Sequence, residues 1–144
     1  MGYSRAGFDV VGVDIRKKRS YPFEFIQADA LEFSFVGFDA IHASPPCQHF
    51  SPITTIHGRR EEHPDLVAAV RSRLQAAGVP YVIENVPQAP LEDPVLLCGS
   101  MFGLEVRRHR IFQPSWYMVA PDCRHILDPK YPQAIQCGNT WPRG

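Results

Sequence analysis

The sequence predicts an α/β fold of the Rossmann type, with parallel strands joined by helical stretches. Three observations predict it. Short apolar, β-branched runs recur along the chain, as they do in buried parallel strands. A stretch with helical periodicity separates two of these runs. Acidic or reactive residues directly follow several runs, and ligands of open α/β sheets bind at that edge.

The composition is that of one ordinary globular domain. The chain has 144 residues, 44% hydrophobic and 21% charged, which is enough for one core. Fifteen basic residues balance fifteen acidic ones, so any binding to nucleic acid would depend on local patches. No apolar run has the length of a membrane span, and the first residues have no signal-peptide pattern. We expect a cytoplasmic monomer without a membrane partner.

The cysteine spacing predicts reduced thiols and no metal. The four cysteines, Cys47, Cys98, Cys123 and Cys137, form no Cys-x-x-Cys pair. Reduced thiols are the default without a secretory signal. A zinc site with Cys123, His125 and either Cys98 or Cys137 is conceivable, but its spacing matches no common ligand template.

The first residues predict the second half of a Rossmann βαβ unit. Residues 2–6 fit the last turn of a helix, and Gly7 fits the left-handed position after it. A buried strand over 8–13 then ends at Asp14. An acid at that place binds ribose hydroxyls in Rossmann units. A solvated turn residue is the simpler interpretation of Asp14 taken alone.

A double-proline turn predicts the position of Cys47. The apolar run 38–42 leads into Pro45-Pro46, which withhold two N–H donors and stop the strand. Cys47 therefore lies just past the carboxyl end of a strand, where a nucleophile is well placed. A small buried apolar residue is the alternative. A further strand over 22–27 ends near Asp29, so three such side chains are expected at one sheet edge.

The residues after the proline turn predict a long loop and then a helix. Residues 48–63 are rich in turn-forming and charged residues, which favours an active-site loop. A helix is predicted over 64–77, ending at Gly78, with Arg71 and Arg73 pointing away from its packed face. The apolar residues that define this face are Leu66, Val70 and Leu74.

Later strands carry Glu84 and an arginine pair. A strand over 80–83 ends in Glu84, whose carboxylate is expected one βαβ unit away from Cys47, where it can assist a nucleophile. Alternate strand residues share a face, so Arg108 and Arg110 are expected to point together. Two guanidinium groups suit a carboxylate or a base edge. An exposed basic edge strand that limits aggregation is the alternative.

Three motifs in this order resemble the DNA cytosine-5 methyltransferases. They are Pro45-Pro46-Cys47-Gln48, Glu84-Asn85-Val86 and Arg108-His109-Arg110-Ile111-Phe112. The flanking residues are similar to the small phage-type members, and the resemblance covers about residues 2–113. It implies a Rossmann-like class I methyltransferase fold, S-adenosylmethionine as cofactor, and a role in phage or restriction-modification DNA methylation. It divides the chain into a catalytic core, 1–113, and a loop-rich segment, 114–144, that starts a target-recognition region.

The resemblance implies roles for four residues. Cys47 would add as a thiolate to C6 of cytosine, and Glu84 would hold N3 and the exocyclic amine. Arg110 would bind the cytosine O2, and Arg108 would orient Glu84 or support the thiolate. The partner would be double-stranded DNA with the target cytosine flipped out of the stack, because C6 is unreachable within it. The loop 48–63 would close over that base.

The resemblance also implies a cofactor site. Asp14 would bind the ribose of S-adenosylmethionine and Asp29 its adenine amine. Ile15 and Pro46 would pack on the adenine or methionine part.

Departures from the family pattern predict an incomplete enzyme. The first family motif, a strand running into Phe-x-Gly-x-Gly, would precede Gly2 and is absent. Val106 stands where the family has glutamine, and the chain after Phe112 is short for a recognition domain and closing helix. The missing strand would be central in the sheet. We therefore expect weak cofactor binding and little activity from the chain as it stands.

Two other functions are compatible with the sequence. One is a catalytically inactive methyltransferase-like module that binds DNA. The other is a thiol enzyme with a different substrate, which would need a histidine base beside Cys47; His42 and His49 are near it in sequence.

Overall fold

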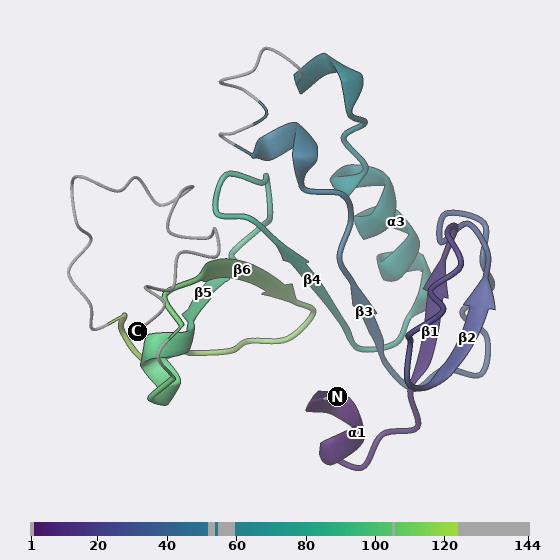
Figure 1. Ribbon diagram of the computed structural model, residues 1–144, viewed down its shortest axis with the longest axis horizontal. Helices are drawn as coiled ribbons and strands as arrows, with labels where there is room; N and C mark the ends of the chain where they lie inside the picture. The colour runs from purple at the N-terminus through teal and green to yellow at the C-terminus, as the bar shows by residue number, and fades with distance from the viewer. Residues whose placement is uncertain (1, 52–53, 55–59, 105, 124–144) are drawn as a thin grey trace. The chain divides into compact units, whose positions relative to one another are not determined.

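The computed structural model describes residues 2–51, 54, 60–104 and 106–123 (Figure 1). The chain divides into two compact units, residues 1–37 and 38–144. The fold is mixed α/β with two sheets, which confirms the α/β class. The division into a core of 1–113 and a following segment stays a prediction, because 124–144 lie outside the described residues. In the described part, no helix is long and apolar enough to cross a membrane.

The first unit contains one short helix and two parallel strands. Helix α1 (Gly2–Arg5) is followed by β1 (Val11–Asp14) and β2 (Glu24–Gln27), and Asp14 lies opposite Gln27 in the register. Gly7 has φ 92°, which confirms the predicted left-handed position after the helix. Both strands start later than predicted. Residues 8–10 do not join the ladder before Val11, and residues 22–23 do not join it before Glu24.

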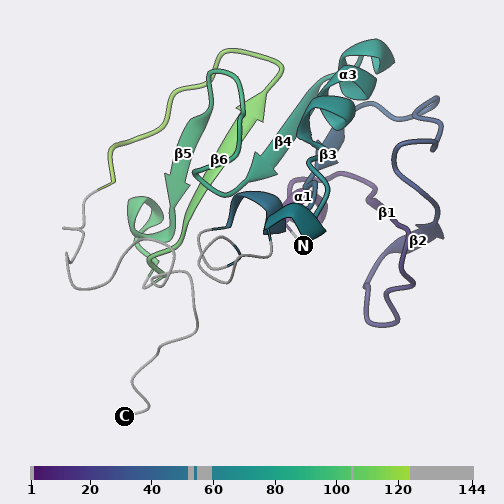
Figure 2. The same ribbon diagram turned by 90° about the horizontal axis from the view of Figure 1, so that it is seen from above.

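The second unit contains a four-stranded mixed sheet (Figures 1 and 2). Its strands are β3 (Ile41–Ala43), β4 (Tyr81–Asn85), β5 (Val95–Cys98) and β6 (His109–Pro114). They are ordered β3-β4-β6-β5, with β3 and β4 parallel and β6 antiparallel to both of its neighbours. The antiparallel strand β6 thus lies inside the sheet, between β4 and β5.

One face of this sheet is the core of the unit. Burial alternates along β4 and β6, as the two-residue period of a strand requires. Ile83 and Ile111 point to the buried face, and Ile111 belongs to a cluster with Phe50 and Val67. The opposite face carries Glu84 and the residues that alternate with the core positions, and it is only half-buried.

Helix α3 (Val67–Ala77) packs on the buried face and starts later than predicted. Asp65 accepts a hydrogen bond from the Val67 N–H at 3.0 Å, so the acid satisfies a free donor at the helix start. Val67 and Leu74 are fully buried, whereas Leu66 and Val70 of the predicted face are half-buried. The end at Gly78, with φ 69°, confirms the prediction.

Arg71 points toward the sheet, so the prediction that it faces away is wrong. Its guanidinium donates to Gln113 Oε1 at 3.2 Å and to the Pro90 carbonyl at 2.6 Å. It also pairs with Glu92 at 3.1 Å. Gln113 is only 5% exposed, and its amide oxygen also accepts from the Glu92 N–H. Arg71 therefore ties α3 to β6 and to the loop after β4.

Replacing Arg71 by methionine is expected to destabilise the protein by about 1.5–3 kcal/mol, the range for hydrogen bonds to charged groups. Methionine keeps the apolar stem but leaves the Pro90 carbonyl without this donor. The free energy of unfolding in urea measures the effect. The exposed neighbour Ser72, changed to alanine, is the control and should change it by less than about 0.5 kcal/mol. Equal stability of Arg71→Met and the parent would show that the network contributes nothing.

Candidate active site

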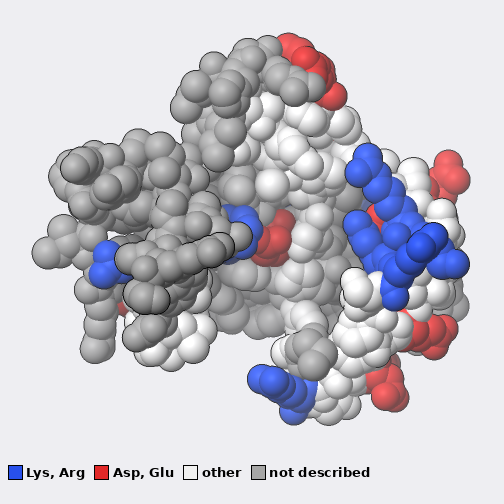
Figure 3. Space-filling view, viewed as in Figure 1, with Lys and Arg blue, Asp and Glu red and all other residues white. Residues whose placement is uncertain are grey.

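Glu84 and Arg110 form an ion pair on the half-buried face of the four-stranded sheet. Arg110 Nε donates to Glu84 Oε1 at 2.7 Å, and the two side chains are 17% and 22% exposed, respectively. Glu84 lies opposite Phe112 in the register, so Arg110 is its diagonal neighbour on the same face. Figure 3 shows acidic and basic side chains adjoining over β4 and β6. Partial burial makes this contact stronger than an exposed surface pair.

Arg108 does not share the strand with Arg110. The sequence predicts both on one strand face, but β6 begins at His109, so strand alternation does not set the direction of the Arg108 side chain. Arg108 is exposed, and its backbone contributes a hydrogen bond to Cys98. The arginine that contacts Glu84 is therefore Arg110.

The turn that carries Cys47 is fastened to the end of β4 by Asn85. Asn85 is 1% exposed, and its Nδ2 donates to the Pro45 carbonyl at 3.1 Å. Its Oδ1 accepts from the Val86 N–H at 2.8 Å. Since Asn85 adjoins Glu84 in β4, the same strand end holds the carboxylate and the proline turn. Sequence reasoning missed this role, although Asn85 stands in the Glu-Asn-Val motif.

Cys47 is half-buried at the start of a short 3₁₀ helix, Gln48–Phe50. Its carbonyl accepts from the Phe50 N–H at 3.1 Å. Phe50 is buried, and Cys47 packs against the cluster that includes Phe50 and Val86. Cys47 therefore packs on the core without being fully buried. Its role as a nucleophile stays a prediction.

Two histidines lie near this turn in the sequence. His42 is on β3, and its Nε2 lies 3.3 Å from Ser44 Oγ. Desolvation lowers the pKa of His42 below its ordinary value, although the charge of Glu84 acts in the opposite direction. His49 Nδ1 lies 2.8 Å from the His63 carbonyl. These contacts hold both rings in place.

The predicted cofactor residues Asp14, Ile15 and Asp29 belong to the first unit. Asp14 ends β1 and Asp29 follows the parallel neighbour β2, so these two acids stand at the same sheet edge. Cys47 follows β3 of the other sheet, so the common edge of all three side chains stays a prediction. Asp14 Oδ1 accepts from the Arg16 N–H at 2.7 Å, and its Oδ2 pairs with Lys18 at 3.2 Å. The Arg16 hydrogen bond is the main cause that lowers the pKa of Asp14.

The remaining cofactor candidates differ in accessibility. Asp29 is exposed and accepts from the Leu31 N–H at 2.8 Å. Ile15 is 64% exposed, which leaves an apolar side chain available for a ring to pack on. Pro46 is exposed as well, but it belongs to the second unit.

An open hollow lies at the other end of β4. It borders Leu74, Tyr81 and Trp116. Tyr81 starts β4, whereas Glu84 and Asn85 are at its carboxyl end. The hollow is therefore not part of the candidate site.

The structure also groups Cys98, His109 and Cys123, which sequence spacing did not associate. The imagined zinc ligands His125 and Cys137 lie outside the described residues. The group was missed because β5 and β6 pair in an antiparallel manner, and spacing alone does not reveal that pairing.

No protein-family model matches the chain, and no curated protein matches its sequence.

Proposed function

We propose that the chain is a DNA cytosine-5 methyltransferase, whole or in part, that methylates C5 of cytosine through a covalent Cys47–C6 adduct. The observation that carries the proposal is the arrangement of three motifs at one strand end. Glu84 binds Arg110 at 2.7 Å, and the adjacent Asn85 holds the proline turn before Cys47 at 3.1 Å. A thiol, a carboxylate and a guanidinium are the groups that the reaction requires.

The chemistry follows from the electronic structure of cytosine. The Cys47 thiolate adds to C6, and a proton shared between Glu84 and N3 relieves the charge that builds on the ring. C5 then becomes enamine-like and nucleophilic, and it would take the methyl group that bound S-adenosylmethionine supplies. A base removes the C5 proton, and the Cys47–C6 bond breaks to restore the aromatic ring. The thiolate is regenerated.

Arg110 has two tasks in this proposal. Its Nε fixes the Glu84 carboxylate, which is the orienting role that the family resemblance gave to Arg108 as one option. A guanidinium has five N–H donors, so others remain for the cytosine O2. Arg108, exposed just before β6, is the arginine that can reach the DNA itself.

The strand arrangement supports a class I methyltransferase fold. Parallel β3 and β4, with antiparallel β6 beside them, agree with a doubly wound sheet. The first unit adds two parallel strands with acids at their carboxyl ends. In the described residues β1 pairs only with β2, and β3 only with β4.

The residues of the first unit fit S-adenosylmethionine in part. Asp29 and Ile15 are exposed and have the chemistry to bind an adenine amine and its ring. Asp14 can accept ribose hydroxyls once Lys18 releases its Oδ2. When bound, S-adenosylmethionine supplies the methyl group.

The test uses duplex DNA with tritium at C5 of the target cytosines. A Cys47–C6 adduct lets C5 take a proton from water and lose tritium, so tritium enters the solvent without any cofactor. We expect release with the parent chain and none with Cys47→Ser. Placing target cytosines opposite abasic sites lowers the cost of flipping.

A second readout separates the two halves of the site. DNA containing 5-fluorocytosine, with saturating S-adenosylmethionine, should form a denaturant-stable complex with the parent only. Tritium release without such a complex would mean that Cys47 adds to C6 but that the chain does not use S-adenosylmethionine. DNA retardation by both chains, with neither release nor complex, would mean a binding module and would refute the catalytic proposal.

A further inference from the structure

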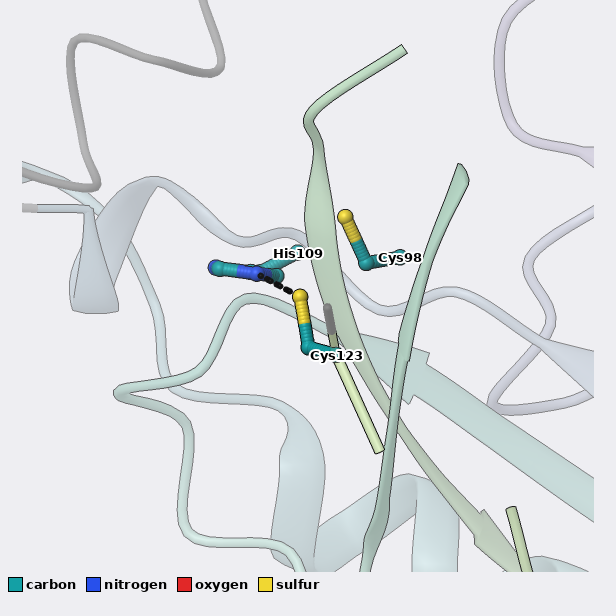
Figure 4. A group of neighbouring side chains, drawn as sticks. All are labelled: Cys98, His109 and Cys123. Atoms are coloured by element: carbon teal, nitrogen blue, oxygen red, sulfur yellow. Dashed lines mark hydrogen bonds between the residues drawn. The ribbon is translucent and has the colours of Figure 1, made fainter. Parts of the chain in front are cut away.

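Two thiols and an imidazole converge beside the β5–β6 hairpin (Figure 4). Antiparallel pairing places Cys98 directly opposite His109, so their side chains share a face. Cys123 comes from the chain after β6, and its Sγ lies 3.4 Å from His109 Nε2. The three donor atoms lie within 4.8 Å of one another. Cys98 is 2% exposed and His109 6%, whereas Cys123 is half-buried.

We propose that Cys98, His109 and Cys123 bind a zinc ion, as two thiolates and a neutral imidazole. Sulfur and imidazole donors together are the ligand set that zinc prefers. Zn–S bonds of about 2.3 Å and Zn–N bonds of about 2.0–2.1 Å, at tetrahedral angles, put sulfur and nitrogen about 3.5 Å apart and the sulfurs about 3.8 Å apart. The sulfur–nitrogen distance of 3.4 Å already meets this requirement. Small side-chain movements complete the set, with a water or another donor as the fourth ligand.

The Ser100 hydroxyl lies beside both sulfurs. Ser100 Oγ donates to Cys98 Sγ at 3.4 Å and lies 3.7 Å from Cys123 Sγ. Burial on its own raises the pKa of the Cys98 thiol, but hydrogen bonds from Ser100, Cys123 and the Arg108 backbone hold it below its usual value. Outer groups of this kind orient metal ligands and tune their charge.

Gly99 allows the turn that brings these groups together. A Cβ at Gly99 would lie 2.4 Å from the Val106 carbonyl oxygen. Only glycine permits this approach of the two backbones. The turn after Cys98 and the segment before His109 are thereby held against each other, which keeps the sulfur and the imidazole on one side of the hairpin.

A zinc ion here would be structural and independent of methyl transfer. His109 and Arg110 alternate along β6, so the metal would lie on the face opposite the Glu84–Arg110 pair. It would join the segment with Cys123 to the hairpin. Failure of the methyltransferase proposal would therefore leave this site unaffected.

The test is metal content and cobalt spectroscopy on the full chain, purified with a non-thiol reductant. We expect about one equivalent of bound zinc. With Co²⁺ we expect a thiolate-to-metal charge-transfer band. Cys98→Ser and Cys123→Ser should each weaken the band by about half, because each removes one of the two thiolates. Each should also lower zinc affinity at least tenfold, since the loss of an outer-shell partner alone costs about 10–100-fold. His109→Gln should lower affinity and shift the visible bands. Cys47→Ser, which also removes one thiol, is the matched control and should change neither.

A variant that does not fold gives no information about the ligands. X-ray absorption of the zinc-loaded parent is therefore a second measurement, which needs no variant. It should fit two sulfur ligands and at least one imidazole. Zinc below about a tenth of an equivalent with no charge-transfer band would overturn the proposal. So would a band that persists in all three variants, or a Cys98–Cys123 disulfide that survives the reductant.

Discussion

Replacing Glu84 by glutamine is expected to slow cofactor-independent tritium release from C5 by about 10²–10⁴-fold, the range for a lost proton-transfer group. Glutamine has nearly the same shape and can still accept from Arg110 Nε, so the 2.7 Å contact can persist as a neutral one. It cannot share a proton with N3. The charge that develops during addition of Cys47 is then left on the ring.

Arg110 provides the matched comparison. Arg110→Lys keeps a positive charge but loses the planar, multi-donor group, so we expect an intermediate loss of rate. Arg110→Ala leaves the half-buried Glu84 carboxylate without this partner and should reduce both rate and stability. Unfolding curves for all three variants separate the two effects. A parent-like rate for Glu84→Gln would remove Glu84 from the reaction.

Replacing Asn85 by leucine is expected to destabilise the protein by about 2–6 kcal/mol, because two buried backbone groups each lose a partner at about 1–3 kcal/mol. These groups are the Pro45 carbonyl and the Val86 N–H. The same change should free the proline turn. Cys47 would then react faster with iodoacetamide, as followed by peptide mass spectrometry, which distinguishes it from the other cysteines.

Asn85→Asp tests the hydrogen bond from Asn85 Nδ2 to the Pro45 carbonyl, here called the Asn85 clamp, by itself. An aspartate still accepts from the Val86 N–H but cannot donate to the Pro45 carbonyl, and an anion facing that oxygen repels it. We expect most of the gain in Cys47 reactivity with this single change. Gln88→Ala removes an exposed amide three residues further on and is the control. Unchanged reactivity in both Asn85 variants would show that the turn holds its shape without the clamp.

The parts of the fold that the sequence predicts well are those set by local residues. The left-handed glycines at Gly7 and Gly78 end their helices as expected, because few other residues tolerate that backbone conformation. Helix α3 starts later than predicted, since Pro64 suits a first turn but the Asp65 side chain accepts from the Val67 N–H in a turn just before the helix. Arg71 was misassigned because its partners come from β6 and a distant loop.

The candidate site divides in the same way. Glu84 was expected at a strand's carboxyl end because an apolar run precedes it, and it lies there, one residue before the end of β4. The Asn85 clamp and the Cys98–His109 neighbourhood depend on which strands pair and in which direction. A single sequence contains no local signal for such pairing. Motif spacing therefore predicts the ionisable groups of the site but not the hydrogen bonds and strand pairing that position them.

The alternation of β6 has a consequence for how this strand can vary. Its inward positions include His109, and its outward positions include Arg110. A shift of one residue would move every side chain to the other face, so the ion pair and the sulfur–nitrogen cluster would be lost in the same event. Pairing with β4 on one side and β5 on the other opposes such a slip. A point substitution in β6 can therefore remove the ion pair or the sulfur–nitrogen cluster alone, whereas an insertion or deletion within the strand removes both.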